Sequence, residues 1–523
     1  MEAVSTPTLT SVVLFIPLVS MFIILLLRED TQSEYIRWGA LIGSLLTFAA
    51  SILLWLSYDP AQPGLQMAQR STWIALSATD ATYNISYYVG VDGLSLLLVI
   101  LTTFIMPLAI LSSFRSHVLV ERGREKLYYA FMLLLEWAMI GVFVAQDLFL
   151  FYIFWEVTLV PMYFLIGIWG AEERIYAAVK FFLYTMAGSI LMLLAILFVG
   201  TQAQSFALPD IIAKVQANPD LFPFGGLFST QSFLFLGFLI AFAIKVPVWP
   251  LHSWLPDAHV QAPTAGSVIL AGVLLKMGTY GIVRFCLPLF PQASIEWAPI
   301  VSVLAIIGII YGAWVSYAQT DVKKLVAYSS VSHLGFVVLG IFALNSQGIQ
   351  GGILQMVNHG ISTGGLFLLV GMLYERRHTK AMSAYGGIWK VMPVFGGISL
   401  VIALSSMGLP GLNGFVGEFT ILLGTFGSPY LGFFFALFAT LGVILAAVYI
   451  LYMFQKVFMG EVDKEENKNL PALHWQELAV LIPIVIVIFW IGLQPGTFFG
   501  AMDASVNQLV TQVTSAASNV VMR

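Results

Sequence analysis

Six ionisable side chains lie within apolar stretches of this 523-residue chain, where charges are rare. They are two glutamates, two lysines and two histidines: Glu156, Lys245, Lys276, His333, His359 and Glu418. Such groups take up and release protons, so inside a membrane they point to an ion or proton pathway. Lys245 stands out, because Pro247 and Pro250 follow it closely and interrupt the helix. A membrane tolerates that break only where protein or water satisfies the freed backbone groups.

The six groups are predicted to lie at similar depths. With a rise of about 1.5 Å per residue, Glu156, Lys276 and His359 lie roughly 14, 18 and 12 Å into their helices. The hydrocarbon core is about 30 Å thick, so these depths are near its middle. Lys245 reaches a similar level if its helix starts near Gln231.

Each group also has a purely structural interpretation. Glu156 and Lys245 would form a static buried ion pair, although such pairs are poor stabilisers. Lys276 would extend to the interface, the two histidines would be satisfied core residues, and Glu418 would cap a glycine-rich break. Six titratable groups at similar depth on separate helices together favour a hydrated relay.

Three other residues of the apolar stretches have no place in this relay. Glu136 is a buried carboxyl without an assigned role, and Arg284 is expected at the membrane interface. The single cysteine, Cys286, excludes an intrachain disulfide and a cysteine-ligated iron–sulfur cluster held by this chain alone.

Composition places the chain among multi-pass membrane proteins. It is 59% hydrophobic and only 10% charged, whereas soluble domains are about 25% charged. No basic run with interleaved aromatic residues suggests a nucleic-acid partner. The first apolar run follows Glu2 without a basic residue, so it is expected to be a retained helix rather than a secretory signal.

Apolar runs of roughly 20 residues predict fourteen spans. They lie near 8–27, 36–57, 93–113, 127–145, 148–168, 175–200, 231–254, 264–287, 297–317, 325–344, 351–374, 391–424, 430–455 and 473–494. The seventh is predicted to break at Pro247 and Pro250, and the twelfth between Gly408 and Gly414.

Basic residues predict the orientation, because cytoplasmic loops are rich in Lys and Arg. Seventeen of the 23 follow odd-numbered spans. They are Arg28, Arg37, Arg115, Arg122, Arg124, Lys126, Arg174, Lys180, Lys323, Lys324, Arg376, Arg377, Lys380, Lys390, Lys456, Lys464 and Lys468. Only Arg70, Lys214 and Arg523 fall on the other side. Both termini are therefore expected on the non-cytoplasmic side, most simply of a bacterial inner membrane.

The two broken spans are five apart and so cross the membrane in opposite directions. This pattern is typical of inverted repeats in transporters. We therefore predict an all-α protein with peripheral helices in 1–126, one five-helix repeat in 127–287, its inverted copy in 288–458, and a last helix and tail in 459–523. No large soluble domain is expected.

Several long motifs resemble the antiporter-like subunits of respiratory complex I. They are Ala241–His259 around Lys245, Gln261–Ser267, Ala271–Gly281 around Lys276, and Ala327–Phe336 around His333. The resemblance runs from about Gly90 to Phe458. It is greatest to the M type, or chain 4, which like this chain has a glutamate in the twelfth span where the L and N types have lysine. The L type also has a long lateral helix, for which nothing after Gly500 is long enough.

The resemblance implies a role for each of the six groups. Glu156 and Lys245 would form the pair that controls proton transfer, and Lys276 would be the central relay. His333 and His359 would carry the proton onward, and Glu418 would be the terminal donor. It also implies that NADH, FMN, iron–sulfur clusters and quinone bind partner subunits, with no cofactor or metal on this chain. Expected partners are L-type and N-type membrane subunits, the peripheral redox arm and lipids.

The energy scale agrees with that assignment. Burial and a neighbouring charge change the protonation free energy of such groups by roughly 4–7 kcal/mol. Moving one charge against about 200 mV costs about 4.6 kcal/mol, so one switchable buried pair is large enough to drive one proton.

Related functions remain open from sequence. The D-type component of a multisubunit sodium/proton antiporter shares these motifs, as does the equivalent component of a membrane hydrogenase or of a ferredoxin- or formate-linked complex. A solitary transporter or a structural scaffold would not explain a lateral row of titratable groups. The proteins that co-purify with the chain would discriminate among these functions.

Overall fold

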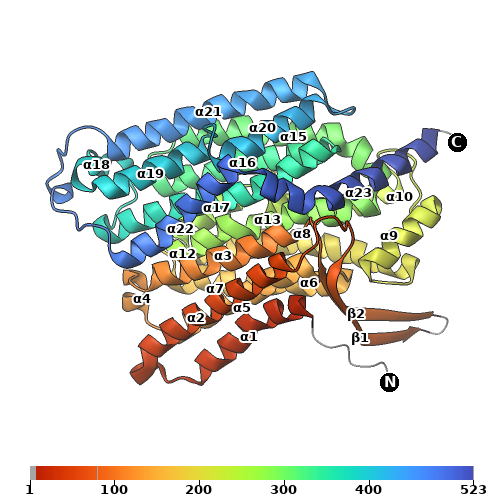
Figure 1. Cartoon of the computed structure of the whole chain (residues 1–523), viewed down its shortest axis with the longest axis horizontal. Coiled ribbons are helices and arrows are strands. Elements are labelled where there is room, and N and C mark those ends of the chain that lie inside the picture. Colours follow the sequence, from red (N-terminus) through yellow and green to blue (C-terminus); the bar gives the residue numbers. More distant parts are fainter. Residues whose placement is uncertain (1–7, 79–80, 522–523) are drawn as a thin grey trace.

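A computed structural model describes residues 8–78 and 81–521 of the chain. The segment before the first helix, with Glu2, lies outside the described residues. Long helices run side by side across the molecule, while a β-hairpin projects at one end (Figure 1).

Twelve described helices are long and apolar enough to cross a membrane. They are α1 (Leu9–Leu26), α2 (Glu29–Leu56), α3 (Leu96–Ser113), α5 (Glu125–Val144), α6 (Leu148–Val157) continued by α7 (Leu159–Trp169), α8 (Arg174–Ala203), α12 to α14 (within Thr264–Leu289), α15 (Pro291–Tyr317), α16 (Val322–Phe342), α17 (Ser346–Arg377), α21 (Phe433–Phe458) and α22 (Trp475–Leu493). They match twelve of the fourteen predicted spans, and the all-helical membrane fold is confirmed.

The seventh and twelfth spans are broken as predicted. The seventh consists of α10 (Thr230–Lys245) and α11 (Trp254–Gln261), and the twelfth of α19 (Pro393–Ser406) and α20 (Asn413–Phe426). Proline lacks the N–H that would continue the first helix beyond Lys245. Gly408 and Gly411 have backbone φ angles of 77° and 91°, which residues other than glycine rarely adopt. The second break therefore also follows from local sequence.

Two elements were not predicted. The stretch 58–92 contains an antiparallel hairpin of β1 (Gln66–Ala78) and β2 (Ala81–Val91), in which Arg70 pairs with Tyr88. The tail contains α23 (Gly496–Val521). Its buried residues recur every three or four positions (Phe498, Met502, Val506, Leu509 and Val513). Such a helix lies on the protein surface and is too polar to be found by a search for membrane spans.

The remaining short elements connect the spans. They are α4 (His117–Arg122), α9 (Leu208–Ala217), α18 (Ile388–Val391) and the 3₁₀ turns η1 (Pro219–Leu221), η4 (Met382–Ala384) and η5 (Glu465–Asn467).

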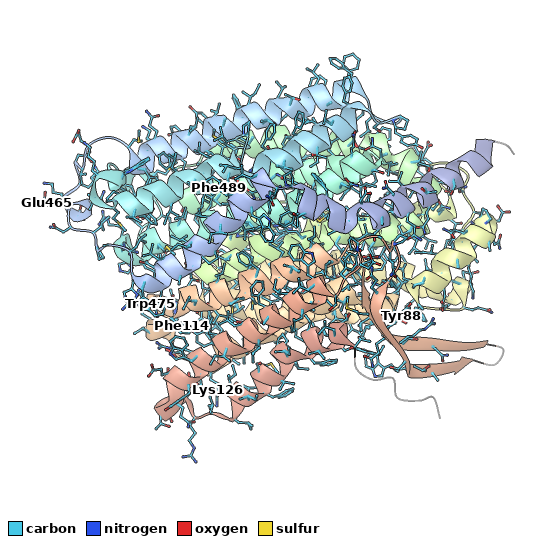
Figure 2. The ribbon with its side chains drawn as sticks, viewed as in Figure 1. Tyr88, Phe114, Lys126, Glu465, Trp475 and Phe489 are labelled. Carbon is cyan, nitrogen blue, oxygen red and sulfur yellow. The ribbon has the colours of Figure 1, made fainter. Side chains whose placement is uncertain are left out.

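The two ends of the bundle differ in character. Lys126 and Glu465 lie at one end and Tyr88 at the other (Figure 2). The first end holds ion pairs between the predicted basic loops and helix termini, such as Arg376 with Glu477. At the hairpin end, the start of α1 bonds to the hairpin through Thr10 and the Met67 carbonyl at 2.9 Å. In α23, Ser505 bonds to the Pro63 carbonyl at 3.0 Å, so this end also holds the described C-terminal helix.

Two spans begin in the same way. Asp147 precedes α6 and accepts hydrogen bonds from the backbone N–H groups of Phe149 and Leu150. Asp321 precedes α16 and accepts one from Lys324. Each aspartate also forms an isolated antiparallel bridge, Asp147 with Ala207 and Asp321 with Ala381. Each residue of the second bridge follows its counterpart in the first by the same number of residues, from 147 to 321 and from 207 to 381. This correspondence supports the predicted repeat.

These caps predict unequal losses of stability. Replacing Asp321 by Ala removes one helix cap, which typically costs about 1 kcal/mol. Replacing Asp147 by Ala is expected to cost more, because its carboxylate also accepts a bond from the buried Ser86 N–H at 2.9 Å. The measurement is the thermal midpoint of the membrane protein on native gels. Asp147→Asn keeps an acceptor oxygen and is the control, and a larger loss in Asp321→Ala would contradict the prediction.

Candidate functional site

Lys245 is the last residue of α10 and is fully buried at the break of the seventh span. Its ammonium has no hydrogen-bond partner. It lies 5.3 Å from the ring centre of Trp155 and 5.5 Å from that of Phe181, so two aromatic faces stabilise the charge. The cation is thus held in place without being tied to an anion.

Glu156 on α6 lies within electrostatic range of Lys245. No hydrogen bond joins the two, because the Lys245 ammonium has no partner and Glu156 Oε1 has none either. The structure therefore brings the predicted pair together but leaves it open.

Lys276 lies in the eighth span, whose helix is widened on both sides of it. The span contains α12 (Thr264–Ile269), the π-helical turn η2 (Leu270–Leu274), α13 (Leu275–Gly281), the π turn η3 (Ile282–Cys286) and α14 (Leu287–Leu289). The fully buried ammonium donates to the Ala271 carbonyl in η2 and contacts His359 Nδ1 at 2.6 Å. Single π turns inside helices occur mostly at functional sites.

The row continues from His359 to Glu418. The rings of His359 on α17 and His333 on α16 lie 5.8 Å apart between centres. His333 Nδ1 is 3.1 Å from Glu418 Oε1, and His333 Nε2 is 3.0 Å from the Tyr449 hydroxyl. Four of the six predicted residues therefore form one buried series, Lys276, His359, His333 and Glu418.

An amide network holds the break of the twelfth span against α17. Gln355 donates to Glu418 Oε1 at 3.2 Å, and Asn358 donates to the Asn413 carbonyl at 2.7 Å. A Cβ on Gly417 would lie 2.3 Å from Gln355 Oε1, so only glycine allows this approach. Sequence reasoning missed the network, although polar residues three or four apart on an apolar helix were a usable signal.

A second group missed from sequence is His259 on α11. It is fully buried, neither ring nitrogen has a hydrogen-bond partner, and it lies within electrostatic range of Lys323 and Lys276. Its ring stacks on Phe367 at 4.5 Å. The motif around Lys245 contained this histidine, but only the fold places it beside the relay lysine.

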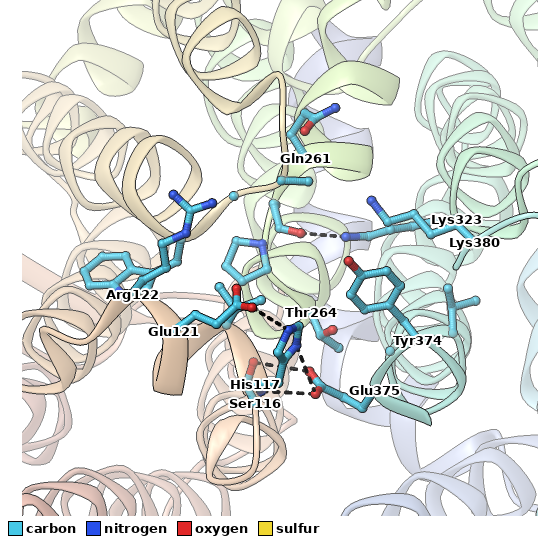
Figure 3. A pocket seen from close by; sticks show the side chains of 18 of the residues that line it. Ser116, His117, Glu121, Arg122, Gln261, Thr264, Lys323, Tyr374, Glu375 and Lys380 are labelled. Atoms are coloured by element: carbon cyan, nitrogen blue, oxygen red, sulfur yellow. Dashed lines mark hydrogen bonds and ion pairs between the residues drawn. The ribbon is translucent and has the colours of Figure 1, made fainter. Parts of the chain in front are cut away.

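Lys323 faces a cavity of about 190 Å³ at the basic-loop end. Figure 3 shows Glu375 and His117 on one side and Lys323 and Lys380 on the other. Lys323 donates to the Ala262 carbonyl at 2.6 Å and Lys380 to that of Val260 at 2.7 Å. Burial lowers the pKa of Lys380, against the charge of Asp321. Both lysines thus hold the segment that directly follows His259.

The other two charges differ in their surroundings. Glu136 is fully buried and neither carboxyl oxygen has a hydrogen-bond partner. Arg284 lies in η3, near the end of the eighth span where the sequence placed it. It is buried and pairs with Asp92, because the turn after the hairpin folds over the end of the eighth span.

Within the described residues, no cluster of His, Cys, Asp or Glu is arranged to hold a metal ion.

Two protein families match the chain. The family described as NADH:quinone oxidoreductase/Mrp antiporter, TM, covers residues 145–445. The family described as NADH-ubiquinone oxidoreductase chain 4, amino terminus, covers residues 40–142. Together they include both broken spans and the buried row.

Relatives match over nearly the whole chain. NADH-quinone oxidoreductase subunit M of Rhodobacter capsulatus is 44% identical over 509 residues, covering 96% of each chain. NADH-ubiquinone oxidoreductase chain 4 of Arabidopsis thaliana is 42% identical over 492 residues, covering 93% of this chain and 94% of that one.

Solved structures show the same fold. A chain of respiratory complex I from Thermus thermophilus with bound NADH superposes with a TM-score of 0.83 at 30% identity, covering 97% of this chain and 99% of that one. A chain of the archaeal membrane-bound sulfane sulfur reductase has a TM-score of 0.78 at 22% identity, over 92% of this chain and 76% of that one. The second likeness concerns the fold alone.

The fold and the buried row define an antiporter-like, proton-translocating membrane subunit of a respiratory complex. The chain belongs to the NADH-quinone oxidoreductase subunit M (chain 4) family, and it is a multi-pass membrane subunit of complex I. This confirms the resemblance drawn from the motifs.

The Tyr449 contact predicts an effect on coupling. Tyr449→Phe removes the bond to His333 Nε2, and a net hydrogen bond of about 1 kcal/mol corresponds to roughly a fivefold change in rate. We expect about that loss in NADH-driven proton pumping by the reconstituted complex. Tyr452→Phe is the matched control on the same helix, because Tyr452 packs on Tyr317 rather than on the row. Equal losses in the two variants would contradict a role for Tyr449.

Proposed function

We propose that this subunit passes protons laterally through the membrane interior along Lys276, His359, His333 and Glu418. The observation that carries the proposal is the buried series itself. Its members lie 2.6 Å apart from Lys276 to His359, 5.8 Å between the two rings, and 3.1 Å from His333 to Glu418. Each group can hold or release a proton, which is what a relay needs.

The contacts suggest an order of transfer. The Lys276 ammonium points at His359 Nδ1, so a proton given up by the lysine arrives at that nitrogen. His359 Nε2 has no partner and is free to pass a proton on toward His333. Glu418 receives it at Oε1, while its Oε2 has no partner and lies beside Gly408 in the break of the twelfth span. The break thus offers an exit from the row.

Glu156 and Lys245 act as the controlling pair in this proposal. Lys245 is buried without an anion bonded to it, and Glu156 is near enough for closure to change the local charge. Closing the pair removes a positive field from the surroundings of Lys276, and opening it restores that field. Lys245 is fully buried and Glu156 partly buried, so the pair can supply more than an exposed surface pair, which supplies about 0–1 kcal/mol.

Protons enter the row from the basic-loop end. The cavity in Figure 3 reaches Lys323, and His259 interacts electrostatically with both that lysine and Lys276. The unpartnered ring nitrogens of His259 make it the connecting group.

The redox chemistry takes place on partner subunits. In this proposal NADH, FMN, the iron–sulfur clusters and quinone bind elsewhere in the complex, and this chain carries no cofactor. L-type and N-type subunits flank it, lipids cover its outer helices, and the peripheral arm supplies the energy.

The subunit is built from two inverted repeats, residues 127–287 and 288–458, with peripheral parts in 1–126 and 459–523. The matching aspartate bridges and the two broken spans support this division. The basic-loop end faces the cytoplasm of a bacterial cell, and both termini face away from it.

Replacing Lys245 tests the relay. The complex with Lys245→Met is expected to assemble and to pump fewer protons per NADH, because the controlling pair has lost its cation. The measurement compares proton uptake with NADH oxidation in proteoliposomes. Lys456→Met, at the end of α21, is the control. An unchanged proton-to-electron ratio in Lys245→Met would refute the proposal.

The orientation has a separate test, aided by the burial of the single cysteine, Cys286. A cysteine placed at exposed Lys468 is expected to react with an impermeant maleimide only in inverted membrane vesicles. A cysteine at Arg70 is expected to react only in right-side-out vesicles. The reverse pattern would overturn the orientation without affecting the relay.

A further inference from the structure

One face of the eighth span leads from the relay lysine toward the hairpin end. Lys276, Tyr280 and Arg284 follow one another at intervals of four residues, about one helical turn each. Tyr280 and Arg284 contact each other, with Arg284 Nε donating to the Tyr280 hydroxyl at 2.9 Å. Arg284 lies about 12 Å along the helix from Lys276, so this face is a direct alternative to the lateral row.

A cavity lies at the far end of this face. It has a volume of about 430 Å³ and is lined by Asp92 and Arg284 together with Gln146 and Ser505. Tyr280 is the only ionisable side chain between Lys276 and Arg284 along this span, and the buried ion pair of Arg284 with Asp92 lies at the cavity. Without a barrier, a proton would leave along the helix and bypass Glu418.

The hydrogen bonds along this face do not run in one direction. Arg284 donates to Asp92 Oδ2 through one terminal nitrogen at 2.6 Å and to Asp92 Oδ1 through the other. It also donates toward the relay, to Tyr280, which in turn donates to the Phe143 carbonyl at 2.9 Å. A guanidinium has only donors and keeps its proton in proteins. The donor direction therefore reverses at Arg284, and the branch ends at a carbonyl that holds no proton to pass on.

The ion pair is fixed from three parts of the chain. The Asp92 carboxylate also accepts the N–H of Leu94 at 3.0 Å at the start of α3. The next residue, Gly93, donates to Ser505 of α23 at 3.0 Å, and a Cβ on it would lie 2.7 Å from the Ala501 carbonyl. The hairpin end and α23 thus press the turn carrying Asp92 onto the eighth span. This assembly explains why Arg284 is buried at the edge of a cavity.

We propose that Arg284, with Asp92 and Tyr280, is a proton seal between Lys276 and the cavity at the hairpin end. The seal forces protons into the lateral row because the Arg284 guanidinium keeps its protons and places a fixed positive charge on the direct route. The proposal rests on the relay described above and assigns Arg284 a positioning role in it.

The test is the passive proton permeability of the whole complex in proteoliposomes. A pH gradient is imposed without NADH, the potential is clamped with potassium and valinomycin, and an internal pH dye reports the decay. Arg284→His puts a group that accepts and releases protons into the route, so a several-fold faster decay is expected. Arg284→Lys keeps a positive charge beside Asp92, and its decay is expected to match that of the unaltered complex.

Two further variants locate the route. Lys276→Met combined with Arg284→His is expected to return the decay to the unaltered rate, because the path then lacks its inner group. Arg37→His breaks the ion pair of Arg37 with Glu125 at the basic-loop end and is expected to leave the decay unchanged. Native gels report assembly in every case, and Arg284→Gln replaces Arg284→His if the histidine variant does not assemble.

Each result decides the proposal. An assembled Arg284→His or Arg284→Gln complex that is as tight as the unaltered one would overturn it. So would equal leaks in Arg284→Lys and Arg284→His, because loose packing would then be the cause, or a leak that persists in the Lys276→Met double variant. The single variant Lys276→Met tests the relay itself, through the number of protons pumped per NADH.

Discussion

The burial of a lysine ammonium in the middle of the protein is the constraint on which the rest of this structure depends. A charge removed from water costs several kcal/mol unless other groups compensate for it. Lys276 finds a carbonyl in a widened helical turn and the nitrogen of His359. These partners are polar but neutral, so the ammonium is satisfied without a permanent anion. The proton on it remains exchangeable.

The broken helices serve the same requirement. Each break places a titratable side chain beside backbone that is not engaged in a regular helix, Lys245 in the seventh span and Glu418 in the twelfth. The second break is held by the amides of Gln355, Asn358 and Asn413 rather than by charges. Neutral groups fix the position of Glu418 without fixing its protonation state. The row is therefore rigid in geometry and variable in charge.

Direction is the other problem that a relay in a membrane must solve. In the proposed relay, a proton on Lys276 has a lateral path through two histidines, and the proposed seal closes the route along its own helix. The lateral path consists of groups that both accept and release protons. The route along the helix contains the Arg284 guanidinium, which keeps its protons and bonds to the Tyr280 hydroxyl. In this proposal the tight turn at Asp92 and the C-terminal helix α23 affect proton transfer, although they lie far from the row in sequence.

Local chemistry made most of the fold predictable. Long apolar runs specify helices that cross a membrane whatever surrounds them. Prolines after Lys245 and glycines before Glu418 break a helix through their own backbone limits. The β-hairpin and α23 were missed because both are too polar to be found as membrane spans, and their stability comes from packing on other segments. The ion pair of Arg284 could not be predicted for a related reason, since its partner Asp92 lies far away in sequence.

The sequence by itself determined the class of protein, the number of spans, the two breaks and the six titratable groups, because each depends on residues close together in the chain. Only the tertiary structure decided how these groups connect. It joined Lys276 to His359 and His333 to Glu418, left Glu156 and Lys245 unbonded, and added Tyr449, Gln355 and His259 to the site. Contacts of 2.6 to 3.1 Å between different helices depend on how those helices pack, which no local pattern specifies.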